Sequence, residues 1–397
     1  MRILCVGNMY PPHHLGGYEL VWQGAVAALR AGGHDVRVLT ADHRLPETDD
    51  GDEPDVHREL RWYWRDHDFP RRSPSERLRL ERHNAAVFDR HVADARPDVV
   101  AWWAMGGMSL SLLARAARHG LPAVAFVHDD WLLYGPVVDQ WIRSFAGWRR
   151  PAGAVAQRIT GISTRFEVAA VARWVFVSAF TRDRALAAGH ELTGVEVAHS
   201  GIDPAFIGPA APRDWGWRML YLGRIDERKG ADTAIEAMTR LPAEATLTIM
   251  GDGDERHLAT LRARAGDFDG RVRIAPARPR TELPAIIDDH DAVVFPARWE
   301  EPWGLVPLEA MARGRAVAST ARGGSREYLR DADNSLIFEA DDADGLATAV
   351  RRLAGDEALR VRLREGGLET ARRHTDVMFH RAVESVLRAA VGAGRGG

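Results

Sequence analysis

Short apolar runs alternate with longer stretches of helical pattern along the first half of the chain. The runs predict strands over residues 2–7, 35–40, 99–104, 123–127, 174–177 and 195–198. Helical patterns lie between most of these runs, as in residues 18–30, where Gly32 and Gly33 end the predicted helix. This alternation is typical of a parallel sheet that carries helices on both faces.

The second half repeats the same alternation. Apolar runs predict strands over residues 218–222, 245–250, 272–275, 292–295, 316–319 and 335–338, and residues 231–240 form the first predicted helix. Residues 203–216 are rich in Pro, Gly and Ala and are the best candidate for a linker. We therefore expect an α/β protein of two doubly wound, Rossmann-like domains that face each other across a ligand-binding cleft.

The expected domains are residues 1–203 and 217–375. A final helix over residues 376–391 is expected to pack back on the N-terminal domain, and residues 392–397 are expected to be disordered. Residues 61–83 break the pattern, because arginines alternate there with Trp62, Tyr63, Trp64 and Phe69. The favoured interpretation is an exposed amphipathic connector. The alternative is a patch that contacts the acceptor or a membrane surface.

Composition narrows the class of protein. Of 397 residues, 46% are hydrophobic and 27% are charged, which excludes disordered, collagen-like and coiled-coil proteins. The net charge of −3 gives no global basic field, so no nucleic-acid partner is expected. Cys5 is the single cysteine, so an intrachain disulfide is excluded. With no signal peptide or membrane span expected, the predicted location is the cytoplasm, with contact to the inner face of the membrane as the alternative.

Two glycine motifs follow predicted strands. Gly16 and Gly17, with Glu19 behind them, come after the first strand, where glycines let an anion approach the backbone and a helix N-terminus. Arg224 and Lys229 lie in a loop between a strand and a helix, and two cations there suit a diphosphate. The alternative is a solvated turn in which neighbouring acids pair with them. Lys229 is the single lysine among 53 basic residues, which favours a function for it.

A carboxylate motif spans residues 300–309. Pro302 and Gly304 prevent one continuous helix, so Glu301 is expected on a loop. Pro307 is expected as the first helical residue, which places Glu309 in the first turn. Two such carboxylates can hold two sets of sugar hydroxyls while the helix N-terminus receives phosphate. The alternative is an acidic surface loop.

A fourth motif, His128-Asp129-Asp130-Trp131, stands at the carboxyl end of a predicted strand. Active sites of α/β proteins form at this edge, so His128 is a candidate for acid/base or polar recognition chemistry.

Together these motifs resemble glycosyltransferase family 4, whose members are retaining nucleotide-sugar enzymes of the GT-B fold. The resemblance covers nearly the whole chain and rests on Pro11-Pro12, Gly16-Gly17-x-Glu19, His128-Asp129, Gly223-Arg224, Lys229-Gly230, Glu301-Pro-Trp-Gly, Leu308-Glu-Ala-Met-Ala and Gly323-Gly324. It implies a nucleotide-diphosphate sugar as donor and a hydroxyl acceptor on a glycan, a lipid or a small molecule. It also implies that no metal or other cofactor is required.

The resemblance assigns roles to single residues. Arg224 and Lys229 would hold the donor diphosphate, Glu301 the hydroxyls of the donor sugar, and His128 would contact the transferred sugar; these four form the expected catalytic set. The expected donor-binding positions are Gly16, Gly17, Trp303, Gly304, Leu305 and Glu309, with Glu309 on the ribose.

The expected acceptor side lies on the N-terminal domain. Its candidate residues are His13, His14, Glu19, Asp129, Asp130 and Trp131, together with segment 61–83. Acidic groups beside Trp131 suit a polyol, a sugar or an amine, and the Arg–aromatic segment suits a phospholipid-linked acceptor.

The sequence also departs from the family pattern. Trp303 stands where Phe is usual, Ser200-Gly201 where Asn-Gly is usual, and Pro276-Ala277-Arg278 where a Gly commonly precedes the residue that contacts the base. The nucleobase is therefore left open.

Two other functions remain open. One is a metal-dependent glycosyltransferase that uses Asp252 and Asp254 to hold a cation on the donor diphosphate. The other is a catalytically inactive module that binds a sugar or a nucleotide sugar.

Overall fold

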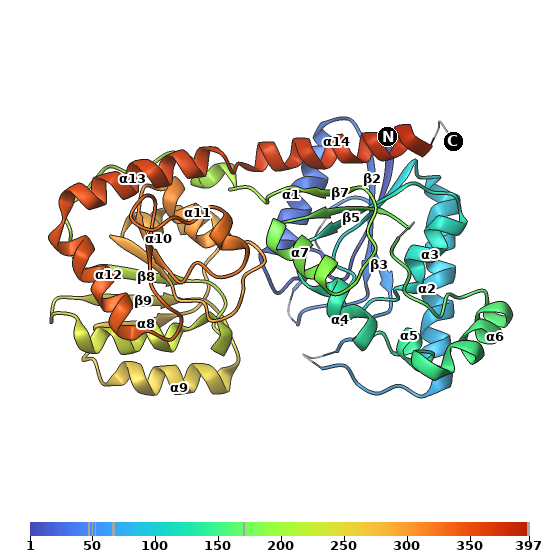
Figure 1. Ribbon diagram of the computed structural model, residues 1–397, viewed down its shortest axis with the longest axis horizontal. Coiled ribbons are helices and arrows are strands. Elements are labelled where there is room, and N and C mark those ends of the chain that lie inside the picture. Colours follow the sequence, from blue (N-terminus) through green and yellow to red (C-terminus); the bar gives the residue numbers. More distant parts are fainter. Residues whose placement is uncertain (47, 50, 52, 66–67, 170, 395–397) are drawn as a thin grey trace. The chain divides into compact units, whose positions relative to one another are not determined.

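The computed structural model describes residues 1–46, 48–49, 51, 53–65, 68–169 and 171–394 and divides into two compact units (Figure 1). Unit 1 consists of Met1–Ala198 together with the last helix from Phe379 onwards, and unit 2 consists of His199–Met378. The predicted linker, residues 203–216, lies inside unit 2. Its Phe206 is buried and the Arg280 guanidinium lies 4.9 Å from the centre of its ring. Composition alone does not show such packing, so the boundary lies a few residues earlier than expected.

Unit 1 is built on a parallel sheet. Its described strands are β1 (Arg2–Val6), β2 (Asp35–Ala41), β3 (Val56–Leu60), β4 (Val99–Trp102), β5 (Ala123–Val127), β6 (Arg173–Phe176) and β7 (Val195–Val197). They are ordered β3-β2-β1-β4-β5-β6-β7, and every pairing is parallel. The helices are α1 (Tyr18–Ala31), α2 (Pro74–Ala95), α3 (Ser111–Arg118), α4 (Trp131–Val138), α5 (Gln140–Ser144), η1 (Gly147–Arg149), α6 (Arg150–Thr160), α7 (Ala179–Ala187) and α14 (Asp376–Gly394).

Both faces of this sheet are buried. In β1, Ile3 and Cys5 pack with α1 and α14, whereas Leu4 and Val6 pack with α2 and α3 on the other face. Because side chains alternate along a strand, such two-sided burial produces a continuous apolar run. This is why β1 could be read directly from the sequence. None of the described helices combines the length and apolar character needed to cross a membrane.

Segment 61–83 differs from its expected form. Trp62 and Tyr63 are buried, Trp64 and Phe69 pack against the same core, and residues 74–83 belong to α2. Ser73 caps that helix in a capping box with Glu76. The exposed-connector interpretation is therefore wrong for the aromatic residues, and a surface patch of them is excluded. Residues 66 and 67 lie outside the described residues.

Two further differences lie at the edge of the sheet and at the end of the chain. Strand β3 was not expected, because an edge strand with one neighbour and a half-exposed face lacks an apolar run. Helix α14 continues to Gly394, so residues 392–394 are helical rather than disordered. The rest of that predicted tail lies outside the described residues.

Unit 2 repeats the architecture of unit 1. Its strands are β8 (Arg218–Leu222), β9 (Thr246–Met250), β10 (Val272–Ala275), β11 (Ala292–Phe295), β12 (Ala316–Ser319) and β13 (Leu336–Ile337), in the order β10-β9-β8-β11-β12-β13 and all parallel. The helices are η2 (Pro204–Phe206), η3 (Glu227–Lys229), α8 (Ala231–Ala237), η4 (Met238–Arg240), α9 (Glu255–Gly266), η5 (Arg280–Glu282), α10 (Leu283–Asp288), α11 (Leu305–Ala312), η6 (Gly324–Glu327), α12 (Ala343–Gly355) and α13 (Glu357–Arg372). Each predicted strand of this half coincides with an observed one to within a residue or two.

Candidate functional site

An ion pair in unit 2 brings two separately predicted motifs together. The Lys229 ammonium, at the end of η3, donates to Glu301 Oε1 on the loop after β11. Only 21% of the lysine side chain and 7% of the glutamate side chain are exposed. Lys229 is therefore not a solvated surface charge. Arg224 agrees better with the alternative of a solvated turn whose acids pair with the cations. Its side chain is 51% exposed and lies 3.2 Å from Asp226.

Glycines fix the backbone on both sides of this pair. Gly230, directly after Lys229, has φ +71°, and a Cβ there would lie 2.1 Å from the Pro296 carbonyl oxygen. Gly323 has φ +67°, and a Cβ there would lie 2.3 Å from the Glu301 carbonyl oxygen. The Gly324 amide donates to that same carbonyl at 2.7 Å. Only glycine fits these two positions, so the Gly323-Gly324 motif serves to place Glu301.

The start of α11 lies beside this pair. Gly304 is its N-cap with φ +87°, and its carbonyl accepts a hydrogen bond from the Tyr328 hydroxyl at 2.5 Å. The first N–H groups of a helix have no partner within the helix, so Leu305 begins a turn that can receive an anion. Trp303 is buried, donates to the Ser200 carbonyl at 3.0 Å and stacks on His199 at 4.1 Å. The Trp303 side chain therefore supports the loop, and only its backbone remains a candidate for donor contact.

Glu309 lies two positions further along α11 than expected. The helix begins at Leu305, so Pro307 is its third residue and Glu309 its fifth. Proline fits anywhere in the first turn, because an N–H there would lack a helical partner, and the sequence could not distinguish these positions. Glu309 is buried, and Arg280 Nη2 lies 2.8 Å from its Oε1.

Arg280 is a site residue that the sequence did not indicate. Besides Glu309, it contacts Asp203 Oδ2 at 3.2 Å. Burial acts to lower the pKa of Arg280, but the two carboxylates raise it above its ordinary value. The sequence offered one clue to Arg280, which is its position two residues after the Pro276-Ala277-Arg278 loop. That signal was hidden because arginine is common throughout the chain.

His128 in unit 1 lies among aromatic rings at the end of β5. Its ring stacks on Trp103 at 5.6 Å and lies 5.4 Å from Tyr18 and 5.8 Å from Phe379. Both ring nitrogens are buried and lack a hydrogen-bond partner among the described residues. Burial lowers the pKa of His128 to about 4, so the ring is neutral at pH 7. This environment favours a polar contact over acid/base chemistry by the ring.

The residues after His128 differ in their surroundings. The Asp129 carboxylate accepts a hydrogen bond from the Tyr134 hydroxyl at 2.7 Å, and burial raises its pKa to about 6. Asp130 forms an ion pair with Arg184 at 2.8 Å. Trp131 is fully buried against Trp174, so its expected place on the acceptor side is wrong. Local sequence does not reveal that Trp131 turns into the core.

The loop before α1 is held together by its own polar groups. Glu19 is buried and its Oε2 accepts a hydrogen bond from the Gly16 amide at 3.1 Å. His13 is also buried and accepts from the Leu45 amide at 3.1 Å. Both side chains therefore shape the loop and do not face an acceptor. His14 lies 3.0 Å from the Pro12 carbonyl, and the space beside Gly17, which caps α1, is open.

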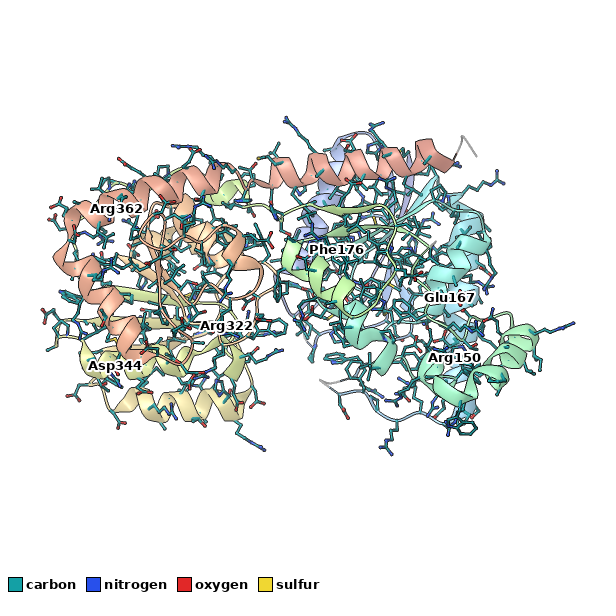
Figure 2. All side chains as sticks on the ribbon, viewed as in Figure 1. Arg150, Glu167, Phe176, Arg322, Asp344 and Arg362 are labelled. Carbon is teal, nitrogen blue, oxygen red and sulfur yellow. The ribbon has the colours of Figure 1, made fainter. Side chains whose placement is uncertain are left out.

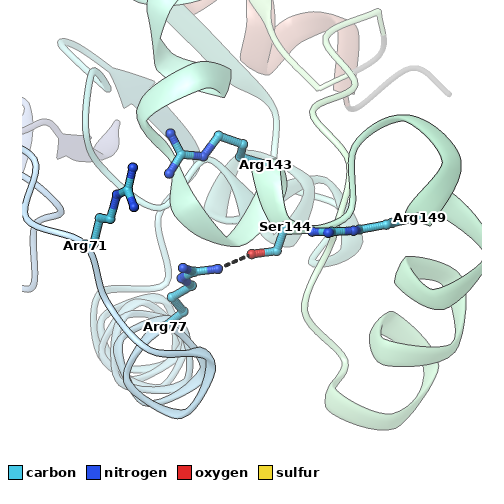
Figure 3. Close-up of a pocket in the computed structure, with 5 residues that line it drawn as sticks. All are labelled: Arg71, Arg77, Arg143, Ser144 and Arg149. Carbon is cyan, nitrogen blue, oxygen red and sulfur yellow. Dashed lines mark hydrogen bonds between the residues drawn. The ribbon is translucent and has the colours of Figure 1, made fainter.

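Four arginines surround a pocket of about 490 Å³ in unit 1 (Figure 3). The lining residues are Arg71, Arg77, Arg143, Ser144 and Arg149. Arg77 donates to the Ser144 hydroxyl at 2.6 Å, whereas no carboxylate of the described residues lies within ion-pair distance of any of the four guanidinium groups. The pocket lies on elements that follow β3 and β5, and its chemistry suits a phosphate group. The sequence did not indicate this pocket, because arginine is common throughout the chain.

Asp252 and Asp254 have local structural contacts. Asp252 accepts a hydrogen bond from the Ala277 amide at 3.0 Å, and Asp254 caps α9 through the His257 amide at 3.1 Å. Among the described residues, neither belongs to a group of three side chains that could hold a metal ion. These contacts explain the two acids as parts of a turn.

Family models match both halves of the chain. Residues 15–206 match glycosyltransferase family 4, and residues 211–370 match the glycosyl transferases group 1. Among curated relatives, the glycogen synthase of Mycobacterium tuberculosis is 31% identical over 385 residues, which cover 90% of this chain and 87% of the relative. The phosphatidyl-myo-inositol mannosyltransferase of Mycolicibacterium smegmatis is 31% identical over 288 residues, which cover 72% of this chain and 69% of the relative.

A solved structure has the same fold over the whole chain. The HepE protein of Anabaena, in complex with UDP and glucose, superposes with a TM-score of 0.69, covers 98% of this chain and 99% of its own, and is 17% identical. The match to glycogen synthase covers most of both chains and the two family models span most of this one. The chain therefore belongs to glycosyltransferase family 4 and has the GT-B fold.

Proposed function

We propose that the protein is a retaining glycosyltransferase that moves a sugar from a nucleotide-diphosphate sugar to a hydroxyl acceptor without a metal ion. The observation that carries the proposal is the Lys229–Glu301 pair. The single lysine of the chain is held, largely out of solvent, against a carboxylate beside the N-terminus of α11. The arrangement supports the proposal, because a cation beside a helix N-terminus can stabilise the charge of a departing diphosphate.

Unit 2 supplies the donor contacts in this proposal. Lys229 and Arg224 neutralise the diphosphate, and the first turn of α11 adds backbone N–H groups. Glu301 accepts hydrogen bonds from the sugar hydroxyls and Glu309 from the ribose, and Arg280, 2.8 Å from Glu309 Oε1, holds this buried carboxylate in position. Unit 1 carries the acceptor, and His128 contributes as a neutral group. The Anabaena protein that shares the fold was solved with UDP and glucose, which supports a nucleotide sugar as donor.

A turnover assay tests this proposal directly. The full chain is incubated with UDP-, GDP-, ADP- and dTDP-sugars and a panel of hydroxyl acceptors, and products are followed by NMR. We expect one donor class to be consumed and the product to keep the anomeric configuration of the donor. EDTA should leave the rate nearly unchanged. Inverted product would contradict retention, and loss of activity that Mn²⁺ restores would favour the Asp252/Asp254 alternative.

The arginine pocket is a candidate site for contact with a lipid-linked acceptor. Close to it in sequence, Trp148 is 84% exposed, and Val155 and Ile159 on α6 are also exposed. Arg150, labelled in Figure 2, begins this helix at the periphery of unit 1. Basic residues next to exposed apolar side chains are typical of a surface that lies on an anionic membrane. We propose that this surface holds the enzyme at the inner face of the membrane, with the pocket on a lipid phosphate.

Vesicle binding tests the membrane contact. We expect the protein to sediment with vesicles of phosphatidylcholine and phosphatidylglycerol but not with phosphatidylcholine alone. The double variant Arg143→Gln/Arg149→Gln should bind about 30-fold more weakly, at about 1 kcal/mol per arginine. Trp148→Ser should also weaken binding. Arg256→Gln/Arg273→Gln on unit 2 is the matched control and should bind normally. Equal binding by all variants would contradict the proposal.

A further inference from the structure

Three side chains that the proposed function does not use lie together in unit 1. They are His57 and Glu59 on β3 and His91 on α2. The distance to Glu59 Oε1 is 3.6 Å from His57 Nδ1 and 3.5 Å from His91 Nε2. One ligand atom from each residue lies within 4.8 Å of the others.

Local structure explains how the three residues converge. His57 and Glu59 are two positions apart on a strand, so their side chains leave the same face. Helix α2 packs on that face and brings His91 from 34 positions along the chain. A His-x-Glu pattern is too common to be a signal, and sequence analysis therefore gave no indication of the cluster.

The imidazoles lack the partners that buried polar groups normally have. His91 is 3% exposed, and neither of its ring nitrogens has a hydrogen-bond partner among the described residues. His57 Nε2 is also buried without a partner, and the two rings are 4.6 Å apart. Leaving several buried nitrogens unpaired costs free energy, and a bound cation would remove part of that cost.

We propose that His57, Glu59 and His91 bind one Zn²⁺ ion, with water in the fourth position. Two imidazole nitrogens and a carboxylate oxygen are a common zinc ligand set. Zinc–ligand bonds of about 2.1 Å in a tetrahedron place ligand atoms about 3.4 Å apart. The two measured distances to Glu59 Oε1, 3.6 and 3.5 Å, are close to this value.

Charges around the cluster are mixed. Arg90 holds Oε2 of Glu59 and thereby leaves Oε1 directed at the histidines. The positive charges of Arg37 and Arg90 oppose a cation, and the carboxylates of Asp55 and Asp94 favour one. Because Glu59 shares its negative charge with Arg90, its carboxylate should not be enough to hold the ion. Zinc binding should therefore require both histidines.

The proposed ion would have a structural role. Strand β3 is the edge of the sheet and is separated from β5, which carries His128, by β2, β1 and β4. Four strand spacings of about 4.8 Å place β3 roughly 19 Å from β5. Zinc would join this edge strand to α2, the helix that carries Arg77, without touching the transfer chemistry.

Zinc binding to the full chain tests this inference. The protein, without a histidine tag, is stripped with chelator, freed of it and titrated with Zn²⁺ by calorimetry. We expect one ion per chain and a rise in Tm, because a ligand that binds the folded state stabilises it. Co²⁺ in place of Zn²⁺ should show the intense visible absorption of a four-coordinate site. EDTA should lower the Tm but leave the transfer rate at low temperature unchanged.

Variants locate the ion. His57→Gln and His91→Gln should each weaken zinc binding by more than the 10- to 100-fold that changes outside the ligand set cost. His83→Gln is the matched control, because His83 lies on the same helix and its Nε2 lies 2.9 Å from the backbone carbonyl of Glu59, whereas the ion would bind the Glu59 carboxylate. Glu59→Gln keeps the test valid if the histidine variants misfold. Glutamine has nearly the same size as glutamate, and this variant should also lose zinc binding. No stoichiometric zinc, or undiminished binding by the ligand variants, would overturn the proposal.

Discussion

Substituting arginine for Lys229 is expected to lower kcat/KM by about 10²-fold or more. All other Lys and Arg positions of this chain hold arginine, so a lysine at an ordinary surface position should tolerate substitution by arginine. Lys229 is mostly buried and its compact ammonium is held against Glu301. A longer planar fork would carry its charge to a different place, and misplacing one electrostatic donor to the transition state costs roughly this much in rate.

Stability separates this effect from misfolding. Arginine keeps the positive charge beside Glu301, so we expect little change in Tm for Lys229→Arg. Lys229→Ala would leave a buried carboxylate unpaired and should cost about 3–5 kcal/mol of unfolding free energy. Arg228→Lys, one position earlier on an exposed part of the turn, is the matched control and should keep full activity. If Lys229→Arg were fully active, the diphosphate site would rest on Arg224 and the helix N-terminus.

Glu301→Gln and Glu309→Gln are each expected to lower kcat/KM for the nucleotide sugar by about 10- to 150-fold. Each change removes the charge from hydrogen bonds to sugar or ribose hydroxyls, which contribute about 1.5–3 kcal/mol when one partner is charged. Arg280 retains Asp203 as a partner in Glu309→Gln, so that variant should remain folded.

Glu300 provides the control for this pair. It adjoins Glu301 but is about half exposed and lies 3.9 Å from Arg322, so Glu300→Gln should behave as the unmodified protein. Steady-state kinetics with circular dichroism on all three variants decides the matter. Full kcat/KM in both Glu301→Gln and Glu309→Gln would show that neither carboxylate holds the donor.

The sequence alone was enough to predict those elements whose successive residues share one environment. Strands such as β11, and β1 from Ile3 onwards, are buried on both faces, so these positions are all apolar and the apolar run marks the limits of the strand. The glycine motifs were also readable, because φ near +70° at Gly230 and Gly323 is a local requirement that other residues meet poorly. These local features were enough to predict two doubly wound units and their family.

Tertiary structure decided everything that depends on partners far away in the chain. Strand β3 is polar because an edge needs little burial, and only its pairing with β2 makes it a strand. Trp62, Tyr63 and Trp131 look like surface aromatics until the core that covers them is known. Lys229 and Glu301 are 72 positions apart, and Glu309 finds Arg280 29 positions before it. Periodicity reports which face of an element is buried, but not which side chain of another element lies against it, because that depends on how the elements pack.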